Sequence, residues 1–336
     1  MAKRASGGPK RDVLQEITDK IISDMERGLA DPDVWQAPWA KLGMGAARNV
    51  VSRKRYRGIN ALVFAITAEE AGAPALWASF KQWSEQGCRV RKGERSTWGV
   101  YWATVKRTDR KTGEPLVDED GNPLTTMRPV PFNVFHVGQV VDATTVSYRG
   151  RIRKVAVDGP AVRKIKARFT PDLPITTGER HDHAVKVLDH AYNRAVHGGD
   201  RAYYAPTEDR VHLPIREAFR DDASYVSTFA RERTHQSGAK GRLTRTFGKR
   251  FGDPDYAAEE LVAEMGAAFI CQHLGVSAEP RPDHAHYLAN WLRALKSDKG
   301  ALYAAAKDAE AALRHIMADA GQPIEDETTE DEEAAV

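Results

Sequence analysis

Residues 231–235 read Arg-Glu-Arg-Thr-His, inside a segment over residues 217–237 for which the sequence predicts a helix. Arg231 and His235 are four residues apart, so their side chains share one face of that helix, and Glu232 stands next to Arg231. Taken alone, these side chains are typical of a solvent-exposed helix face. The segments on either side of the motif are therefore needed to interpret it.

The C-terminal half around this motif has the pattern of a helical domain. Helices are predicted over residues 177–196, 217–237, 254–273, 284–297 and 299–318. The helix at 254 has a clear start, because Asp253 suits the N-cap and Pro254 suits the first helical position. Gly275 ends it. A short pair of strands is expected before the motif, near residues 203–204 and 211–213.

The N-terminal half changes from a helical pattern to a strand pattern. Helices are predicted over residues 12–29, 59–71 and 77–86. From Trp98 to Ala103, side chains alternate as in a strand, and residues 109–123 read as a long, turn-rich hairpin loop. Strands near 124–130 and 132–137 would complete a small antiparallel sheet. The fold class expected for the whole chain is therefore α+β.

Length and composition are those of an ordinary globular protein. The chain has 336 residues, which suggests two domains. No run approaches the ~18 apolar residues of a transmembrane helix, and the first residues lack the apolar core of a secretion signal. The only cysteines, Cys88 and Cys271, are far apart, so a disulfide framework is not expected. We expect a cytoplasmic protein with no membrane partner.

Composition also suggests where the domains begin and end. We expect a flexible basic leader over residues 1–11, a first domain over 12–142, a linker over 143–160, a second domain over 161–320 and a disordered acidic tail over 321–336. The tail contains seven acids and no base, whereas the whole chain has a net charge of +3. The body is therefore basic, and the tail either competes with a polyanion for its surface or only aids solubility.

Two segments of the N-terminal half combine basic and aromatic residues. Residues 46–60 contain five bases and no acid around Tyr56, and residues 77–102 interleave lysines and arginines with tryptophans. Proteins that bind single-stranded DNA need cations for the phosphates and flat rings that stack on unpaired bases. The same tryptophans would also suit a hydrophobic core. The basic cluster favours a nucleic-acid partner.

Motifs in these segments resemble the N-terminal domain of ArdC-type antirestriction proteins. The matching motifs are Tyr56-Arg57-Gly58-Ile59-Asn60, Trp77-x-x-x-Lys81-Gln82-Trp83, Gly87-x-x-Val90-Arg91-Lys92-Gly93-Glu94 and Val134-Phe135-x-Val137-x-Gln139. They follow in order over residues 10–142. The resemblance implies a single-stranded DNA-binding domain and a role in protecting plasmid or phage DNA from host restriction. A host restriction component is then a further expected partner.

The resemblance also suggests which side chains contact DNA. Carried over to this sequence, the candidates are Arg55, Tyr56, Arg57, Asn60, Lys81, Gln82, Arg91 and Lys92. The resemblance does not say which of these side chains reach the DNA.

The C-terminal half resembles the zincin-like metallopeptidase domain of the same family, from about Tyr203 to Ala309. A zincin carries HExxH on a helix, where two histidines bind zinc and the glutamate polarises the attacking water. The resemblance places Glu232 as the general base and His235 as a metal ligand. Glu260 becomes the third ligand, and Glu264 is expected to orient a ligand histidine.

Arg231 departs from this family pattern, because it stands where the first histidine of the motif should be. A guanidinium group does not deprotonate in proteins and cannot ligate a cation. We therefore expect zinc to bind weakly or not at all, unless a histidine such as His212, His284 or His286 replaces the missing ligand. Each of these could equally be an ordinary surface or core residue.

Two hypotheses of function follow. The first is a single-stranded DNA-binding antirestriction-type protein with a degenerate, inactive zinc-peptidase-like domain, and the alternative is an active zinc peptidase that its N-terminal domain targets to DNA. The first predicts that the guanidinium of Arg231 pairs with Glu232, Glu260 or Glu264 in place of the metal. The opposite outcome is an Arg231 that points to solvent.

Overall fold

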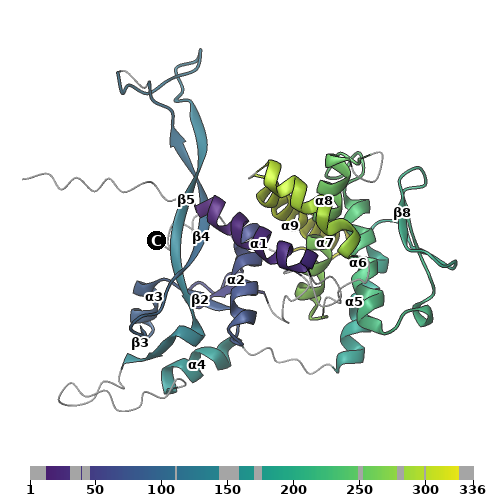
Figure 1. Cartoon of the computed structure of the whole chain (residues 1–336), viewed down its shortest axis with the longest axis horizontal. Helices are drawn as coiled ribbons and strands as arrows, with labels where there is room; N and C mark the ends of the chain where they lie inside the picture. The colour runs from purple at the N-terminus through teal and green to yellow at the C-terminus, as the bar shows by residue number, and fades with distance from the viewer. Residues whose placement is uncertain are drawn as a thin grey trace, which may run out of the picture.

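The structure is a computed structural model that describes residues 13–30, 39, 46–109, 112–143, 159–169, 176–248, 253–277, 284–298 and 300–324. The expected leader, nearly all of the expected linker and the acidic residues from 325 onward lie outside the described residues. The fold is α+β, with a sheet-containing half at one end and a mostly helical half at the other (Figure 1). No helix in the described part is long and apolar enough to cross a membrane.

A four-stranded sheet organises the N-terminal half. Its strand order is β1-β2-β5-β4, formed by β1 (Arg48–Asn49), β2 (Leu76–Ala78), β5 (Thr125–His136) and β4 (Thr97–Lys106). Helix α2 (Gly58–Glu70) covers one face, because Phe64 packs against Phe132 and Trp77. At Gly99 a side chain would collide with the Phe132 ring, so only glycine allows this close packing.

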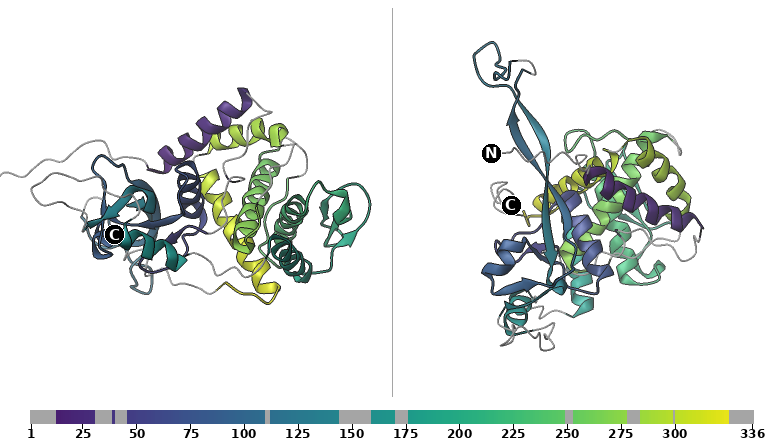
Figure 2. Two further views of the ribbon diagram at one scale, coloured as in Figure 1. Left: turned by 90° about the horizontal axis from the view of Figure 1, so that it is seen from below. Right: turned by 60° about the vertical axis from the view of Figure 1, so that its left-hand side comes forward.

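Strands β4 and β5 form a long antiparallel arm that extends beyond the rest of the sheet (Figures 1 and 2). The pairing runs from Thr97 opposite Val134 to Lys106 opposite Thr125, with Trp102 opposite Pro129. The sequence predicted separate strands near 124–130 and 132–137, whereas β5 is a single strand. Pro131 within β5 has no N–H to donate, which explains why the sequence suggested a break there.

Shorter helices and strands complete the N-terminal half. Residues 76–78 are strand β2, and helix α3 spans only Phe80–Glu85, so the predicted helix over 77–86 was too long at its start. The reason is a capping box, in which Ser79 accepts a hydrogen bond from the backbone of Gln82 and starts the helix there. Beside α3, strand β3 (Cys88–Val90) pairs with β6 (Val140–Asp142), and α4 (Pro160–Phe169) packs on β6.

The C-terminal half is a helical bundle with a short sheet at its edge. Its helices are α5 (Thr177–His190), α6 (Asp222–Ser237), α7 (Pro254–Leu274), α8 (His284–Ser297) and α9 (Ala301–Asp319). The sheet has the order β7-β9-β8, formed by β7 (Val196–His197), β9 (Arg210–Leu213) and β8 (Tyr203–Ala205). Helix α7 is central, since it packs against α6, α8 and α9.

Helix α6 begins later than the sequence predicted. Residues 216–218 form a short 3-10 turn, and the helix starts after Asp221, whose side chain accepts a hydrogen bond from the backbone N–H of Ser224 at 2.8 Å. Asp221 is therefore the N-cap. Gly275 ends α7 in a left-handed conformation (φ 70°), as the sequence predicted.

The two halves share one hydrophobic core. Helix α1 (Val13–Ala30) packs along α8, and α2 packs on α9 (Figure 2). Trp39 makes an edge-to-face contact with Trp291 of α8, with ring centroids 5.5 Å apart. The first helices of the chain therefore help to bury the C-terminal bundle.

Candidate functional site

The motif at residues 231–235 lies where α6 packs closely against α7. A side chain at Gly266 of α7 would collide with Thr234 of α6, so the close approach of the two helices requires this glycine. Glu260 and Glu264 are four residues apart on the face of α7 that meets α6. The approach therefore brings carboxylates of α7 to the motif of α6.

Arg231 is the centre of a buried cluster of three carboxylates. Its Nε donates to Oε1 of Glu264 at 2.9 Å, and its Nη1 donates to Oε1 of Glu232 at 2.6 Å. Its Nη2 donates to Oε2 of Glu260. Arg231 and all three glutamates are buried. The expected pairing is confirmed, and Arg231 does not point to solvent.

His235 lies on the other side of Glu260. Its Nε2 is 3.8 Å from Oε1 of Glu260, and its Nδ1 is 3.1 Å from Oε1 of Glu259. An ionised carboxylate only accepts hydrogen bonds, so Nδ1 carries the proton in this contact. Burial alone would raise the pKa of Glu259, but hydrogen bonds from His235 and Arg245 outweigh burial and hold that pKa below its usual value.

The roles of the α7 acids differ from the expectation in one respect. Glu264 was expected to orient a ligand histidine, but it contacts Arg231, and Glu259 contacts His235 instead. Arg245, whose Nε donates to Glu259 at 2.9 Å, was also missed. It lies outside the helices and strands, where no periodicity marks a position. Glu259 could have been found as the direct neighbour of Glu260.

These residues do not fit a zinc ion. The guanidinium of Arg231 already pairs with the carboxylates that would face the metal, and it offers no lone pair. Within the described residues no group of three or more His, Cys, Asp and Glu side chains could hold a metal ion. His212 does not replace the missing ligand, because it stacks on Tyr203 and contacts Glu208. The side chains of His284 and His286 lie outside what the structure describes.

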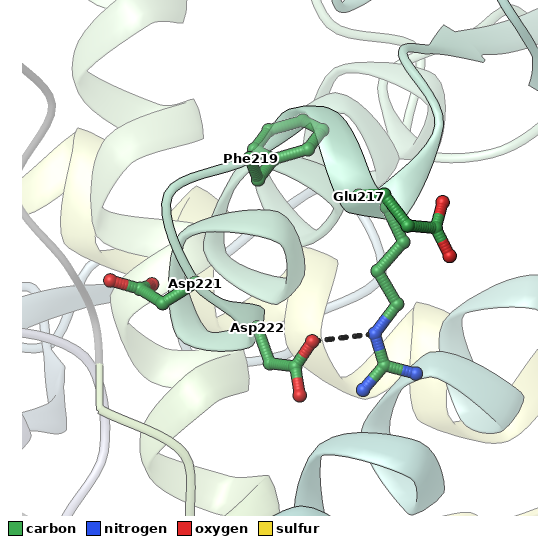
Figure 3. Close-up of a pocket in the computed structure, with 5 residues that line it drawn as sticks. Glu217, Phe219, Asp221 and Asp222 are labelled. Carbon is green, nitrogen blue, oxygen red and sulfur yellow. Dashed lines mark hydrogen bonds and ion pairs between the residues drawn. The ribbon is translucent and has the colours of Figure 1, made fainter.

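A separate hollow of about 330 Å³ lies at the start of α6 (Figure 3). The cation in its lining is already paired, since Arg216 contacts Asp222 and Asp182 at 2.7 Å each. Arg231 is nine residues further along α6, or roughly 13 Å at the helical rise of ~1.5 Å per residue. The hollow therefore does not belong to the carboxylate cluster.

Several of the DNA-contact candidates hold parts of the protein's own fold together. Tyr56 is buried against Phe64, and its hydroxyl accepts a hydrogen bond from Asn49. Asn60 is buried and bonds to both the backbone N–H and the C=O of Val100, at 2.9 and 2.7 Å.

Arg55 and Gln82 are also engaged within the chain. The Arg55 guanidinium contacts His273 at 3.1 Å and Glu310 at 3.7 Å, and its side chain is only 9% exposed. Gln82 caps α3 and accepts a hydrogen bond from Asn49.

The remaining candidates are closer to solvent. Lys81 and Lys92 are exposed, and Arg57 is half-buried at the N-cap of α2. Arg91 is half-buried and pairs with Glu94. These four do not converge with Arg231 in one site. The exposed pair, Lys81 and Lys92, is the part of the candidate set with the freest access to a ligand.

Comparison with known proteins matches both halves of the chain to described domains. Residues 11–137 match the N-terminal domain of the anti-restriction factor ArdC, and residues 182–308 match a zincin-like metallopeptidase domain. An uncharacterised protein of Sinorhizobium fredii, y4eC, is 34% identical over 306 residues, which cover 89% of each chain. The DNA primase TraC of Escherichia coli is 29% identical over 328 residues, but this chain spans only 28% of that primase.

Two solved structures of similar fold are of the antirestriction protein ArdC of plasmid R388. Its metal-free structure has a TM-score of 0.69 and 29% identity, covering 94% of this chain and 100% of that one. Its Mn(II)-bound structure has a TM-score of 0.64 and 29% identity, covering 92% and 98% respectively.

Proposed function

The chain belongs to the family of ArdC antirestriction proteins of mobile elements, and we propose that it binds single-stranded DNA while its zincin-like half is a metal-independent scaffold. The N-terminal half would then supply the DNA contacts. The C-terminal half would stabilise the molecule and offer a surface to other proteins, among them a component of a host restriction system.

The observation that carries the scaffold proposal is the contact of Arg231 with three carboxylates. A guanidinium group keeps its positive charge at every physiological pH, so it supplies positive charge to the carboxylate cluster where a metal would otherwise supply it. Water activation in a zincin needs a Lewis acid next to the general base, and Arg231 cannot act as one. Glu232, the expected base, is instead an acceptor for Arg231.

The DNA-binding proposal is supported by family membership and by the exposed cations of the N-terminal half. Lys81, Lys92 and Arg53 are exposed there, which suits phosphate contacts without sequence preference. We expect the single-stranded form to bind more tightly than duplex, because unpaired bases can stack on exposed rings.

Fluorescence anisotropy with matched single-stranded and duplex oligonucleotides tests this part. The affinity for the single strand should exceed that for duplex and should fall steeply between low and moderate salt, as counterions are released. Equal affinity for both forms, or an affinity that salt does not change, would contradict the proposal. Plasmid transfer into restricting and non-restricting recipients, with and without the chain, tests protection from restriction.

The metal part is tested with Arg231→His. This variant restores the first histidine of the motif, so we expect it to bind about one zinc per chain, whereas the unmodified protein should hold little. The double variant Arg231→His/His235→Ala is the matched control and should lose that zinc again. If the unmodified protein already carries stoichiometric zinc, the scaffold proposal is wrong and an active DNA-targeted peptidase becomes the better hypothesis.

A further inference from the structure

On the face of the arm turned away from Phe132, strand β5 is open to solvent, whereas on β4 the same face is covered as far as Val100, which is buried in the shared core. Side chains alternate along a strand, and Phe132 and Val134 of β5 point into the core with α2. The other set along β5 points the opposite way, and all of its members from residue 127 to residue 133 are exposed: Met127, Pro129, Pro131 and Asn133. A row of non-ionic side chains is therefore open to solvent along the arm.

Exposed aromatic rings stand at both ends of this row. Phe80, the first residue of α3, is 60% exposed, and its ring centroid is 6.4 Å from that of Phe135, which continues the row. Trp102 of β4 lies opposite Pro129 on the same face and is 48% exposed. Six residues of strand separate Phe135 from Pro129, or about 20 Å at ~3.4 Å per residue. Single-stranded nucleic acids bind across such rings, since every base has a face that stacks.

The charges along the strands of the arm favour a polyanion, whereas those at the hairpin tip do not. Neither β4 nor β5 contains an acidic residue, whereas Lys106 and Arg128 are exposed on them. Lys81, next to Phe80, is 84% exposed. Acids begin only in the hairpin tip, where residues 118–120 are all acidic and exposed. Phosphates are therefore favoured along the arm and disfavoured at its tip.

We propose that the face between Phe80 and Trp102 is the binding surface for single-stranded nucleic acid, with Phe80 and Trp102 each stacking on a base. The proposal rests on the DNA-binding function proposed above and places it on residues that, apart from Lys81 and Phe135, the sequence motifs did not single out. Lys81 and Lys106 contact phosphates at the two ends of the face. The hydrogen bond from Ser96 to Asn133, at 2.9 Å, fixes a polar side chain between them.

The test is the double variant Phe80→Ala/Trp102→Ala in the full chain, with a fluorescein-labelled thymidine oligonucleotide in anisotropy measurements. Each lost ring should weaken binding about tenfold, from a stacking contribution of about 1–3 kcal/mol per base. Both rings are exposed, so the melting temperature should stay close to that of the unmodified protein. Tyr203→Ala, which removes an equally exposed ring from the C-terminal half, is the control and should bind normally.

Charge variants of the same face give an independent readout. Lys81→Gln with Lys106→Gln should reduce the salt dependence of binding by about one unit for each lost phosphate contact. Val117→Ala at the exposed tip should change neither affinity nor salt dependence. A double ring variant that binds as tightly as the unmodified protein overturns this placement while the DNA-binding function stands. An unmodified protein that binds no single-stranded oligonucleotide overturns both.

Discussion

Arg55 illustrates how a single side chain can serve the fold where the sequence suggested a ligand contact. Its guanidinium joins the N-terminal half to His273 of α7 and Glu310 of α9. Burial, together with the positive charges of Arg55 and Arg48, lowers the pKa of His273 to about 4. The neutral imidazole can then accept a hydrogen bond from Arg55.

This contact predicts a dependence of stability on pH. The pKa of His273 is about 4 in the folded protein and ~6.5 when unfolded, so the unfolded chain binds an extra proton between these values. The stability due to neutral His273 is complete above pH ~6.5 and is lost as the pH falls toward 4. His273 is exposed, so solvent screening limits the effect to about 1 kcal/mol.

The variant His273→Gln isolates this contribution, because its amide oxygen can still accept from Arg55 but does not titrate. Urea unfolding at pH 7 and pH 4.5 should show a smaller loss of stability in the variant than in the unmodified protein. Equal losses in the two proteins would show that His273 titrates normally in the folded state.

At the scale of elements, Asn60 fixes helix α2 to strand β4. Its amide satisfies both backbone groups of Val100 in the interior. Asn60→Ala should lower the free energy of unfolding by about 2–6 kcal/mol, since two buried backbone groups lose their partners at ~1–3 kcal/mol each. Thermal melts measure this loss. Single-stranded DNA affinity per folded molecule should be unchanged, and a selective loss of affinity would instead indicate direct DNA contact.

Local signals predicted most helices but few of the contacts between them. Sequence periodicity was sufficient to predict helices α1, α2, α7, α8 and α9. The short apolar run at Trp77, in contrast, suits a strand and a helix equally. The resemblance to a zincin-like domain led to the expectation that Arg231 would pair with Glu232, Glu260 or Glu264. The contact of Glu259 with His235 depends on the rotation of α7 against α6, which the sequence does not specify.

At the scale of the whole molecule, the two halves share one hydrophobic core, so destabilising one half should also destabilise the other. Leu62 of α2 and Leu302 of α9 are both fully buried in the same cluster, and α2 packs on α9. We predict that these helices unfold together. Leu302→Ala should cost about 2–5 kcal/mol and should lower hydrogen-exchange protection equally in α2 and α9. Protection that falls in α9 alone would show that the halves open separately.

The arm has a consequence for how the molecule approaches a nucleic acid. Residues 108–124 contain five acids and two bases, whereas both strands below them carry bases only. The arm is thus an electric dipole, negative at the tip and positive toward its root. In the field of a polyanion such a dipole experiences a torque that turns its tip away. The arm would therefore approach a strand with its root foremost, where Phe80 lies, and with its tip directed away before the first contact forms.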